Sequence, residues 1–226
     1  MAKRKDRITE IRSGILIGVA VLIAAIAVYG IYYSLGFGSD GPYVALDRPD
    51  GSGDVEVSVF FSYTCPICQR FEESLEDWAD DLPAGVTVER IHIASSPTNR
   101  MFAKAYVALD RHGAADANQR RIFRAIHDRN RRFDTVEAIA DFVDGFGIER
   151  ATFLRTYASP RIARAVTADE QEFISLGLLG VPAVVVDDKY VINMSGGRKQ
   201  ALAATDDLVR ELVAQRASSA TTDSGA

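Results

Sequence analysis

The sequence predicts an α/β domain interrupted by an all-helical insertion and preceded by one N-terminal transmembrane helix. Apolar side chains alternate at period two over residues 54–62 and 86–93, and between these stretches they recur at helical spacing. Residues 98–177 have mainly helical spacing, and two short β-branched runs follow them. Ahead of the domain, residues 13–39 form a run of 27 positions without a charged side chain.

The composition fits one globular domain with an appendage, because the chain has 226 residues and domains usually have roughly 100–200. Hydrophobic residues make up 47% and charged residues 25%, which excludes a disordered chain and a polytopic membrane protein. The net charge of −5 offers no basic face, so we expect no nucleic-acid binding. Two cysteines are too few for a disulfide scaffold, yet Cys65 and Cys68 lie within four positions.

The N-terminus predicts a signal anchor. Residues 1–12 carry five Lys or Arg against two acidic residues. Within the predicted anchor at 13–35, the apolar centre at 15–33 matches the ~20 residues that a helix needs to cross hydrocarbon. The basic end should stay in the cytoplasm, so the domain should lie outside it. A signal peptide cleaved near residues 25–27 is one alternative, and a buried core helix is another. The two membrane interpretations agree on an extracytoplasmic domain.

Residues 36–53 are rich in Gly, Pro, Ser and Asp and predict a linker, with a short strand at 43–46. Residues 54–62 then predict a strand whose second face is partly covered at Phe60. The helix that follows has one apolar stripe and ends at residues 83–85, before the strand at 86–93. The stripe consists of Ile67, Phe71, Leu75, Trp78 and Leu82.

The second half of the chain predicts several helices, a hairpin and a closing helix. The helices fill the insertion at 98–177, and the hairpin joins strands at 183–186 and 190–192. We expect residues 54–97 and 178–216 to form one domain with parallel pairing through the first crossover and an antiparallel edge made by the hairpin. Residues 217–226 are small and polar, and we expect them to be disordered.

The cysteine pair lies at the strand–turn–helix junction, with Pro66 in the first helical turn. Unpaired backbone N–H groups and the helix dipole at such an N-terminus stabilise a thiolate. Cys65 would therefore be the attacking sulfur, and Cys68, about one turn further on, would resolve a mixed disulfide. A redox dithiol is the interpretation that we favour.

Two other interpretations of the cysteines remain open. A zinc site needs about four ligands, and the further candidates His92, His112 and His127 lack ligand spacing. A purely structural disulfide would close a very small loop and would constrain the unfolded chain little. We interpret each histidine as a surface or core residue.

Two blocks of sequence carry a resemblance to a known family. Residues 59–72, VFFSYTCPICQRFE, followed by LPAGV at 82–86, resemble the active-site segment of DsbA-like thiol:disulfide oxidoreductases. Residues 180–183, GVPA, look like that family's cis-proline loop. The resemblance covers most of the chain from residue 54 to about residue 213.

The resemblance implies a thioredoxin-like fold with an inserted helical domain. It implies Cys65 and Cys68 as the catalytic pair, with Pro66, Ile67, Val181 and Pro182 around them binding extended substrate peptide. By this resemblance, the reaction would need no organic cofactor and no metal. The expected substrates are exported proteins with cysteines, and a DsbB-like membrane protein would reoxidise the pair. We expect the protein to span the bacterial inner (cytoplasmic) membrane once, with its catalytic domain in the periplasm or another extracytoplasmic space. We also expect it to be a monomer.

Two positions depart from the family pattern. Ile67 replaces a frequent histidine before the second cysteine, and Val59 stands at a strand position where the family often has a buried acid. We therefore expect a reduction potential above the roughly −270 mV of thioredoxin and below the roughly −120 mV of DsbA. A membrane-anchored reductase, for example in cytochrome maturation, and a non-enzymatic peptide-binding holdase are the alternative functions.

Overall fold

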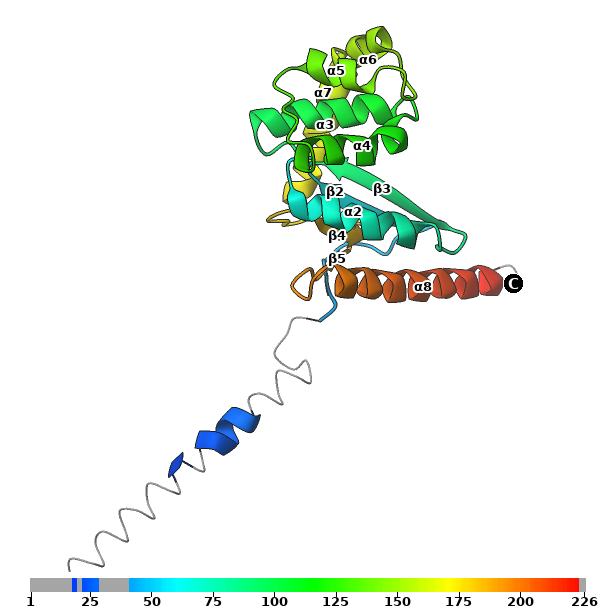
Figure 1. Cartoon of the computed structure of the whole chain (residues 1–226). Helices are drawn as coiled ribbons and strands as arrows, with labels where there is room; N and C mark the ends of the chain where they lie inside the picture. The colour runs from blue at the N-terminus through cyan, green and yellow to red at the C-terminus, as the bar shows by residue number, and fades with distance from the viewer. Residues whose placement is uncertain (1–17, 20–21, 29–40, 224–226) are drawn as a thin grey trace, which may run out of the picture. The chain divides into compact units, whose positions relative to one another are not determined.

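The computed structural model describes residues 18–19, 22–28 and 41–223 and divides into two units, Met1–Gly41 and Pro42–Ala226 (Figure 1). In the first unit, residues 22–28 are helical and their large apolar side chains are exposed. Residues 18–19 of the predicted anchor are also helical, whereas its other positions, the basic segment and residues 36–40 of the predicted linker lie outside the described residues. Within the described ranges, no helix is both long and apolar enough to cross a bilayer.

The second unit is built on a five-stranded sheet in the order β1-β5-β4-β2-β3 (Figure 1). The predicted crossover is confirmed, because β2 and β3 pair in parallel. The hairpin β4–β5 is not the edge that the sequence predicts: β4 pairs antiparallel with β2 and so lies in the middle of the sheet, and β1 covers β5. The strands are β1 Tyr43–Ala45, β2 Val55–Phe61, β3 Val86–His92, β4 Ala183–Val186 and β5 Tyr190–Ile192.

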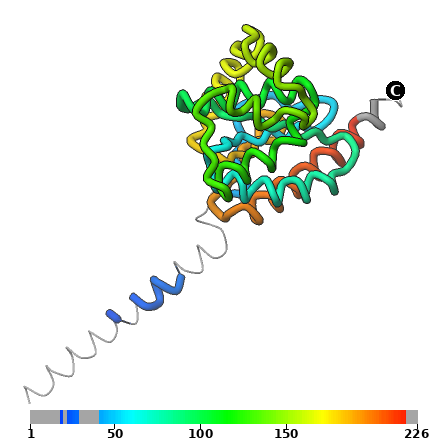
Figure 2. Tube along the Cα trace, turned by 45° about the horizontal axis from the view of Figure 1, so that its top comes forward, coloured from blue at the N-terminus to red at the C-terminus, as the bar shows by residue number. Residues whose placement is uncertain are grey.

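Helices cover the sheet and form the insertion (Figures 1 and 2). Two of them, α2 and α8, lie side by side, and their apolar side chains pack against one face of β2 and β4. Helices α3 to α7 follow one another between β3 and β4, as the helical spacing predicts. The helices are α2 Pro66–Ala79, α3 Pro97–Asp110, α4 Ala115–His127, α5 Val136–Val143, α6 Arg150–Tyr157, α7 Pro160–Ser175 and α8 Arg198–Asp223.

Separate hydrophobic cores cover the two faces of β2 and explain its sequence pattern. Val55, Val57 and Val59 face α2 and α8 and are at most 1% exposed. On the other face, Phe60 packs against Phe173 of α7 with ring centroids 5.6 Å apart. Because both faces are covered, β2 is a nearly continuous apolar run at its C-terminal end, where the cysteine pair follows.

Two sequence expectations are wrong in detail. Helix α8 runs to Asp223, so residues 217–223 of the predicted disordered tail at 217–226 are helical, and residues 224–226 lie outside the described residues. Ser218 and Ser219 donate hydrogen bonds back to the carbonyls of the preceding turn, and adding residues to an existing helix avoids the cost of nucleation. Ile67 does not belong to the buried stripe of α2: its side chain is 54% exposed, whereas Phe71 and Leu75 are buried.

Candidate active site

The cysteine pair lies at the junction of β2 and α2, where Cys65 is the N-cap residue of the helix. Its Sγ accepts a hydrogen bond from the backbone N–H of Cys68 at 3.2 Å, in the way that a capping side chain satisfies the first helical turn. Pro66 begins the helix, where its missing N–H costs nothing. Both thiols are free; Cys65 is half-buried, while Cys68 is only 2% exposed. An attacking group can therefore reach Cys65 first.

The two thiols are electrostatically unequal. A hydrogen bond from the Cys68 thiol, together with the backbone N–H groups of Cys68 and Ile67, lowers the pKa of Cys65 to about 6, although burial acts in the opposite direction. The same shared hydrogen, and then burial, raise the pKa of Cys68 well above its ordinary value. At neutral pH the pair therefore holds one thiolate, on Cys65, and one thiol, on Cys68. This assigns nucleophile and leaving-group character to Cys65.

The loop before β4 completes the surroundings of Cys65. The carbonyl oxygen of Val181 lies 3.7 Å from the Cys65 Sγ, although 116 positions separate the two residues. The Val181–Pro182 bond is cis. Of the six residues predicted for the site, the structure brings Cys65, Cys68 and Val181 into one cluster, with Pro182 following in the same loop. Pro66 and Ile67 form the exposed first turn of α2 beside them.

Beneath the pair, the backbone of Tyr63 is held by two histidines. The ring of His92, in β3, accepts the Tyr63 N–H at 3.0 Å, and the ring of His127, at the end of α4, bonds the Tyr63 carbonyl at 2.8 Å. Burial lowers the pKa of His92 to about 3, so this ring stays neutral. Sequence alone gives neither histidine this role, because their separations of 29 and 64 residues from Tyr63 match no motif.

A buried polar chain joins the sheet to the insertion. The Tyr63 hydroxyl donates to Gln119 at 2.7 Å, and the Gln119 amide donates to Glu72 at 3.2 Å. The other oxygen of Glu72 accepts from Arg90 at 2.8 Å, and the Glu72 side chain is only 4% exposed. The buried carboxylate under the site thus comes from α2 and is paired by β3, whereas Val59 is an apolar core residue.

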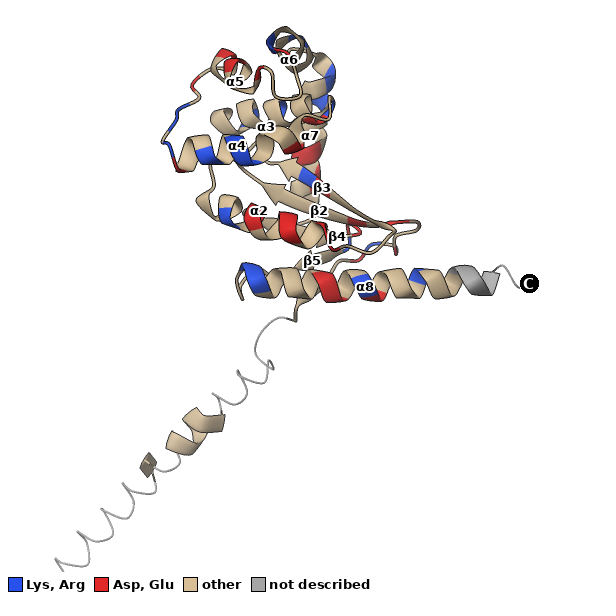
Figure 3. Ribbon diagram, turned by 45° about the vertical axis from the view of Figure 1, so that its right-hand side comes forward, with Lys and Arg blue, Asp and Glu red and all other residues tan. Residues whose placement is uncertain are grey.

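Complementary charges meet between α2 and α4 (Figure 3). The surface of α2 is mainly acidic, and α4 carries several arginines. Arg120 of α4 forms an ion pair with Glu76 of α2, and Gln69 donates to Asp128 just beyond α4 at 2.9 Å. The helix that carries the cysteines is therefore docked on the insertion along its length.

No metal centre is found at the site: in the part of the chain that the structure describes, no three His, Cys, Asp or Glu side chains gather as metal ligands.

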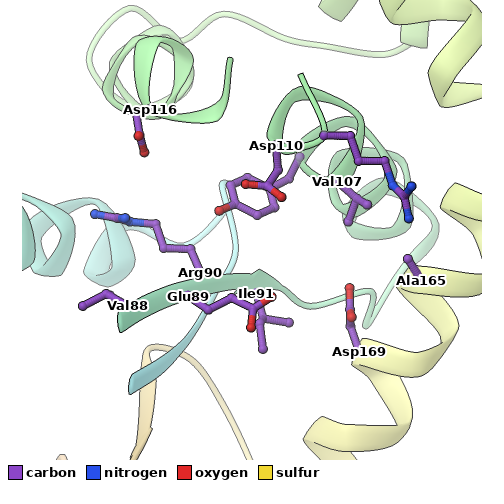
Figure 4. A pocket seen from close by; sticks show the side chains of 11 residues that line it. Val88, Glu89, Arg90, Ile91, Val107, Asp110, Asp116, Ala165 and Asp169 are labelled. Atoms are coloured by element: carbon purple, nitrogen blue, oxygen red, sulfur yellow. The ribbon is translucent and has the colours of Figure 1, made fainter. Parts of the chain in front are cut away.

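A separate cavity of about 450 Å³ lies between β3, α3 and α7 (Figure 4). Its lining includes Glu89, Asp110 and Asp169, and neither cysteine reaches it. Burial raises the pKa of Asp169 to about 6, and burial together with nearby Glu56 raises that of Glu89 to about 7.

A reduced Cys-x-x-Cys pair that caps a helix after a central strand, facing a proline loop, defines a thiol:disulfide oxidoreductase of thioredoxin-like fold. The sequence profile of the DSBA-like thioredoxin domain matches residues 56–205, and the chain belongs to this family.

Relatives and solved structures agree with this assignment. The chain is 30% identical over 161 residues to the thiol:disulfide interchange protein DsbA of Azotobacter vinelandii, covering 70% of this chain and 75% of the relative. The Pseudomonas aeruginosa DsbA is 30% identical over 174 residues, covering 75% and 82%. The crystal structure of a variant of the Pseudomonas aeruginosa protein superposes with a TM-score of 0.72 at 29% identity, covering 76% of this chain and 96% of that one.

Proposed function

We propose that this enzyme introduces disulfides into exported proteins from a domain tethered to the bacterial inner membrane. The observation that carries the proposal is the lowered pKa of Cys65 at the N-terminus of α2. A thiolate that is stabilised in this way is a good leaving group, so the reduced pair is favoured and the disulfide is readily given away.

The reaction transfers two electrons and needs no cofactor. A substrate thiolate attacks the Sγ of Cys65, the Cys65–Cys68 bond breaks, and Cys68 takes up a proton, which suits its raised pKa. The second substrate thiolate then attacks the substrate sulfur of the mixed disulfide and releases Cys65 as a thiolate. The substrate leaves oxidised, and the pair is left reduced.

Substrate peptide would bind along the exposed first turn of α2 and the loop at Val181 and Pro182. The 54% exposed side chain of Ile67 supports this placement, because an apolar group next to a reactive thiol favours an unfolded chain over a folded surface. The Val181 carbonyl beside the Cys65 Sγ offers a backbone acceptor to an extended peptide.

Reoxidation would require another protein, since the sequence has no third cysteine to pass electrons on. A DsbB-like membrane oxidoreductase fits this role, and an anchor at residues 13–35 would keep the domain close to it. The exposed apolar helix at 22–28 supports the anchor.

A domain with a complete dithiol needs no second copy, so we propose a monomer. Separation of membranes from soluble fractions, and size-exclusion chromatography in detergent, test these two points.

The test of the activity uses the full chain, oxidised, in detergent micelles, with a reduced two-cysteine peptide. We expect the peptide to become disulfide-bonded, and Cys65→Ser to abolish this reaction because the attacked sulfur is missing. In cells, Cys68→Ser should accumulate mixed disulfides with substrates. A protein that binds unfolded peptide equally well after Cys65→Ser and never oxidises it is a holdase, and this outcome contradicts the proposal.

A further inference from the structure

We propose that His127 is a positioning residue for the dithiol: its ring N–H holds the carbonyl of Tyr63 and thereby favours the thiolate form of Cys65. This inference rests on the proposed function and adds a role for the helical insertion. His127 is the last residue of α4, so it belongs to an element outside the sheet that carries the cysteines.

The geometry fixes which ring nitrogen carries the hydrogen. A backbone carbonyl can only accept, so the Nε2 of His127, 2.8 Å from the Tyr63 oxygen, must be the donor. The ring lies nearly parallel to that of Phe123, at 26° with centroids 6.2 Å apart. Phe123 is 1% exposed, so it offers the imidazole a rigid surface. The donor is therefore held in place before any substrate arrives.

The backbone N–H of Tyr63 is held as firmly as its carbonyl. His92 accepts the Tyr63 N–H at 3.0 Å, and the other ring nitrogen of His92 is 2.8 Å from the Ile93 carbonyl. The Tyr63 side chain is fully buried and bonded to Gln119. With N–H, carbonyl and hydroxyl all engaged, Tyr63 can shift only if three hydrogen bonds break, and Cys65 follows it by two residues.

The carbonyl of Tyr63 explains why the donor matters for redox chemistry. Tyr63 precedes Cys65 by two residues, and the partial negative charge on its carbonyl oxygen opposes a nearby thiolate when no donor offsets it. The N–H of His127 offsets that charge, and His127 in addition lowers the pKa of Cys65 by direct electrostatic attraction, as the smallest of the contributions that act on it. The neighbouring carboxylate of Asp128 accepts a hydrogen bond from the Gln69 amide at 2.9 Å.

The effect should appear in the equilibrium of the pair as well as in its titration. A thiolate exists only in the reduced form, so whatever stabilises it makes the disulfide more oxidising. Loss of the His127 donor is expected to change the equilibrium constant with glutathione about five- to tenfold. A tenfold change is about 30 mV for this two-electron couple.

The experiment compares three variants of the full chain in detergent. His127→Phe removes the donor and keeps a planar ring against Phe123, His127→Gln keeps an N–H donor, and His112→Gln is the control. His112 bonds the hydroxyl of Thr156 in the insertion, away from Tyr63. Two quantities are measured: the pKa of Cys65 from thiolate absorbance at about 240 nm, and the equilibrium constant with glutathione.

We expect His127→Phe to raise the Cys65 pKa by close to one unit and to make the pair five- to tenfold less oxidising. His127→Gln should stay nearer to the wild type, and His112→Gln should match it. A His127→Phe protein that loses thermal stability but keeps both redox quantities has lost only packing, and this overturns the inference. Equal shifts in the Phe and Gln variants overturn it too. Both readouts remain valid if the enzyme fails to oxidise peptides, so failure of the proposed function is recognised separately.

Discussion

Replacing Cys68 by alanine should raise the pKa of Cys65, because the Cys68 thiol supplies the largest contribution that lowers it. A hydrogen bond to a charged group contributes about 1.5–3 kcal/mol, and the half-buried position of Cys65 favours the lower end of that range. Since one pKa unit is about 1.4 kcal/mol, the pKa should move from about 6 to roughly 7. The backbone N–H groups remain, so it should stay below the ordinary value of 9.0.

The assay is the rate of alkylation of Cys65 by iodoacetamide between about pH 4 and pH 9, which follows the thiolate fraction. At pH 7 that fraction should fall from about nine-tenths in the wild type to about one-half in Cys68→Ala. Cys68→Ser is the matched control, because its hydroxyl can still donate to the Cys65 sulfur. The reasoning is refuted if Cys68→Ala titrates like the wild type, or if the serine variant shifts as far as the alanine variant.

Three further predictions concern stability. The pKa of Cys65 is about 6 in the folded protein against an ordinary value of 9.0, so the unfolded reduced chain binds more protons than the folded one between pH 6 and pH 9. The unfolding free energy of the reduced form, relative to that of the oxidised form, should therefore rise over this range in urea titrations. A difference that stays constant with pH contradicts this prediction. Glu72→Ala leaves the buried Arg90 unpaired and should lower the unfolding free energy by about 3 kcal/mol. Glu76→Ala removes a more exposed ion pair with Arg120 and should lower it by less than about 1 kcal/mol. Equal losses of unfolding free energy in urea refute the distinction. The pKa of Glu89 is raised to about 7, so the folded protein holds a proton that the unfolded chain releases, and the oxidised protein should lose stability as the pH rises from about 5 to 7.5. Glu89→Gln should make this pH dependence weaker. Parallel stability curves for the two proteins exclude Glu89 as its source.

Local patterns predict most of the elements of this fold. The period-two stretch of β2 and the helical spacing of α2 are properties of neighbouring residues, so the junction that carries Cys65 can be derived from the sequence. The sequence predicts a short strand at 43–46, but the position of β1 beside β5 cannot be derived in this way, because β5 lies about 150 positions away along the chain. Ile67 shows the limit of spacing, since it has the helical register of Phe71 and yet lies at the exposed first turn.

The site divides in the same way. Cys65 and Cys68 follow from their own motif, while Val181 enters only through the family resemblance, because its approach to Cys65 depends on how β4 pairs with β2. His92 and His127 escape sequence reasoning because each acts on Tyr63 through one hydrogen bond from a different layer of the fold. Single long-range contacts of this kind leave no spacing to detect.

The short strand β1 also has a mechanical consequence. It is the first strand after the N-terminal segment, and it joins the outer side of β5 through an antiparallel ladder that includes the Leu46 N–H to Lys189 carbonyl bond of 2.8 Å. Tension along the N-terminal segment would load this ladder first, at the sheet margin. Two strands, β5 and β4, separate the loaded edge from β2, which leads to the dithiol. Tension on the N-terminal segment would therefore separate β1 from β5 before it could deform the geometry around Cys65.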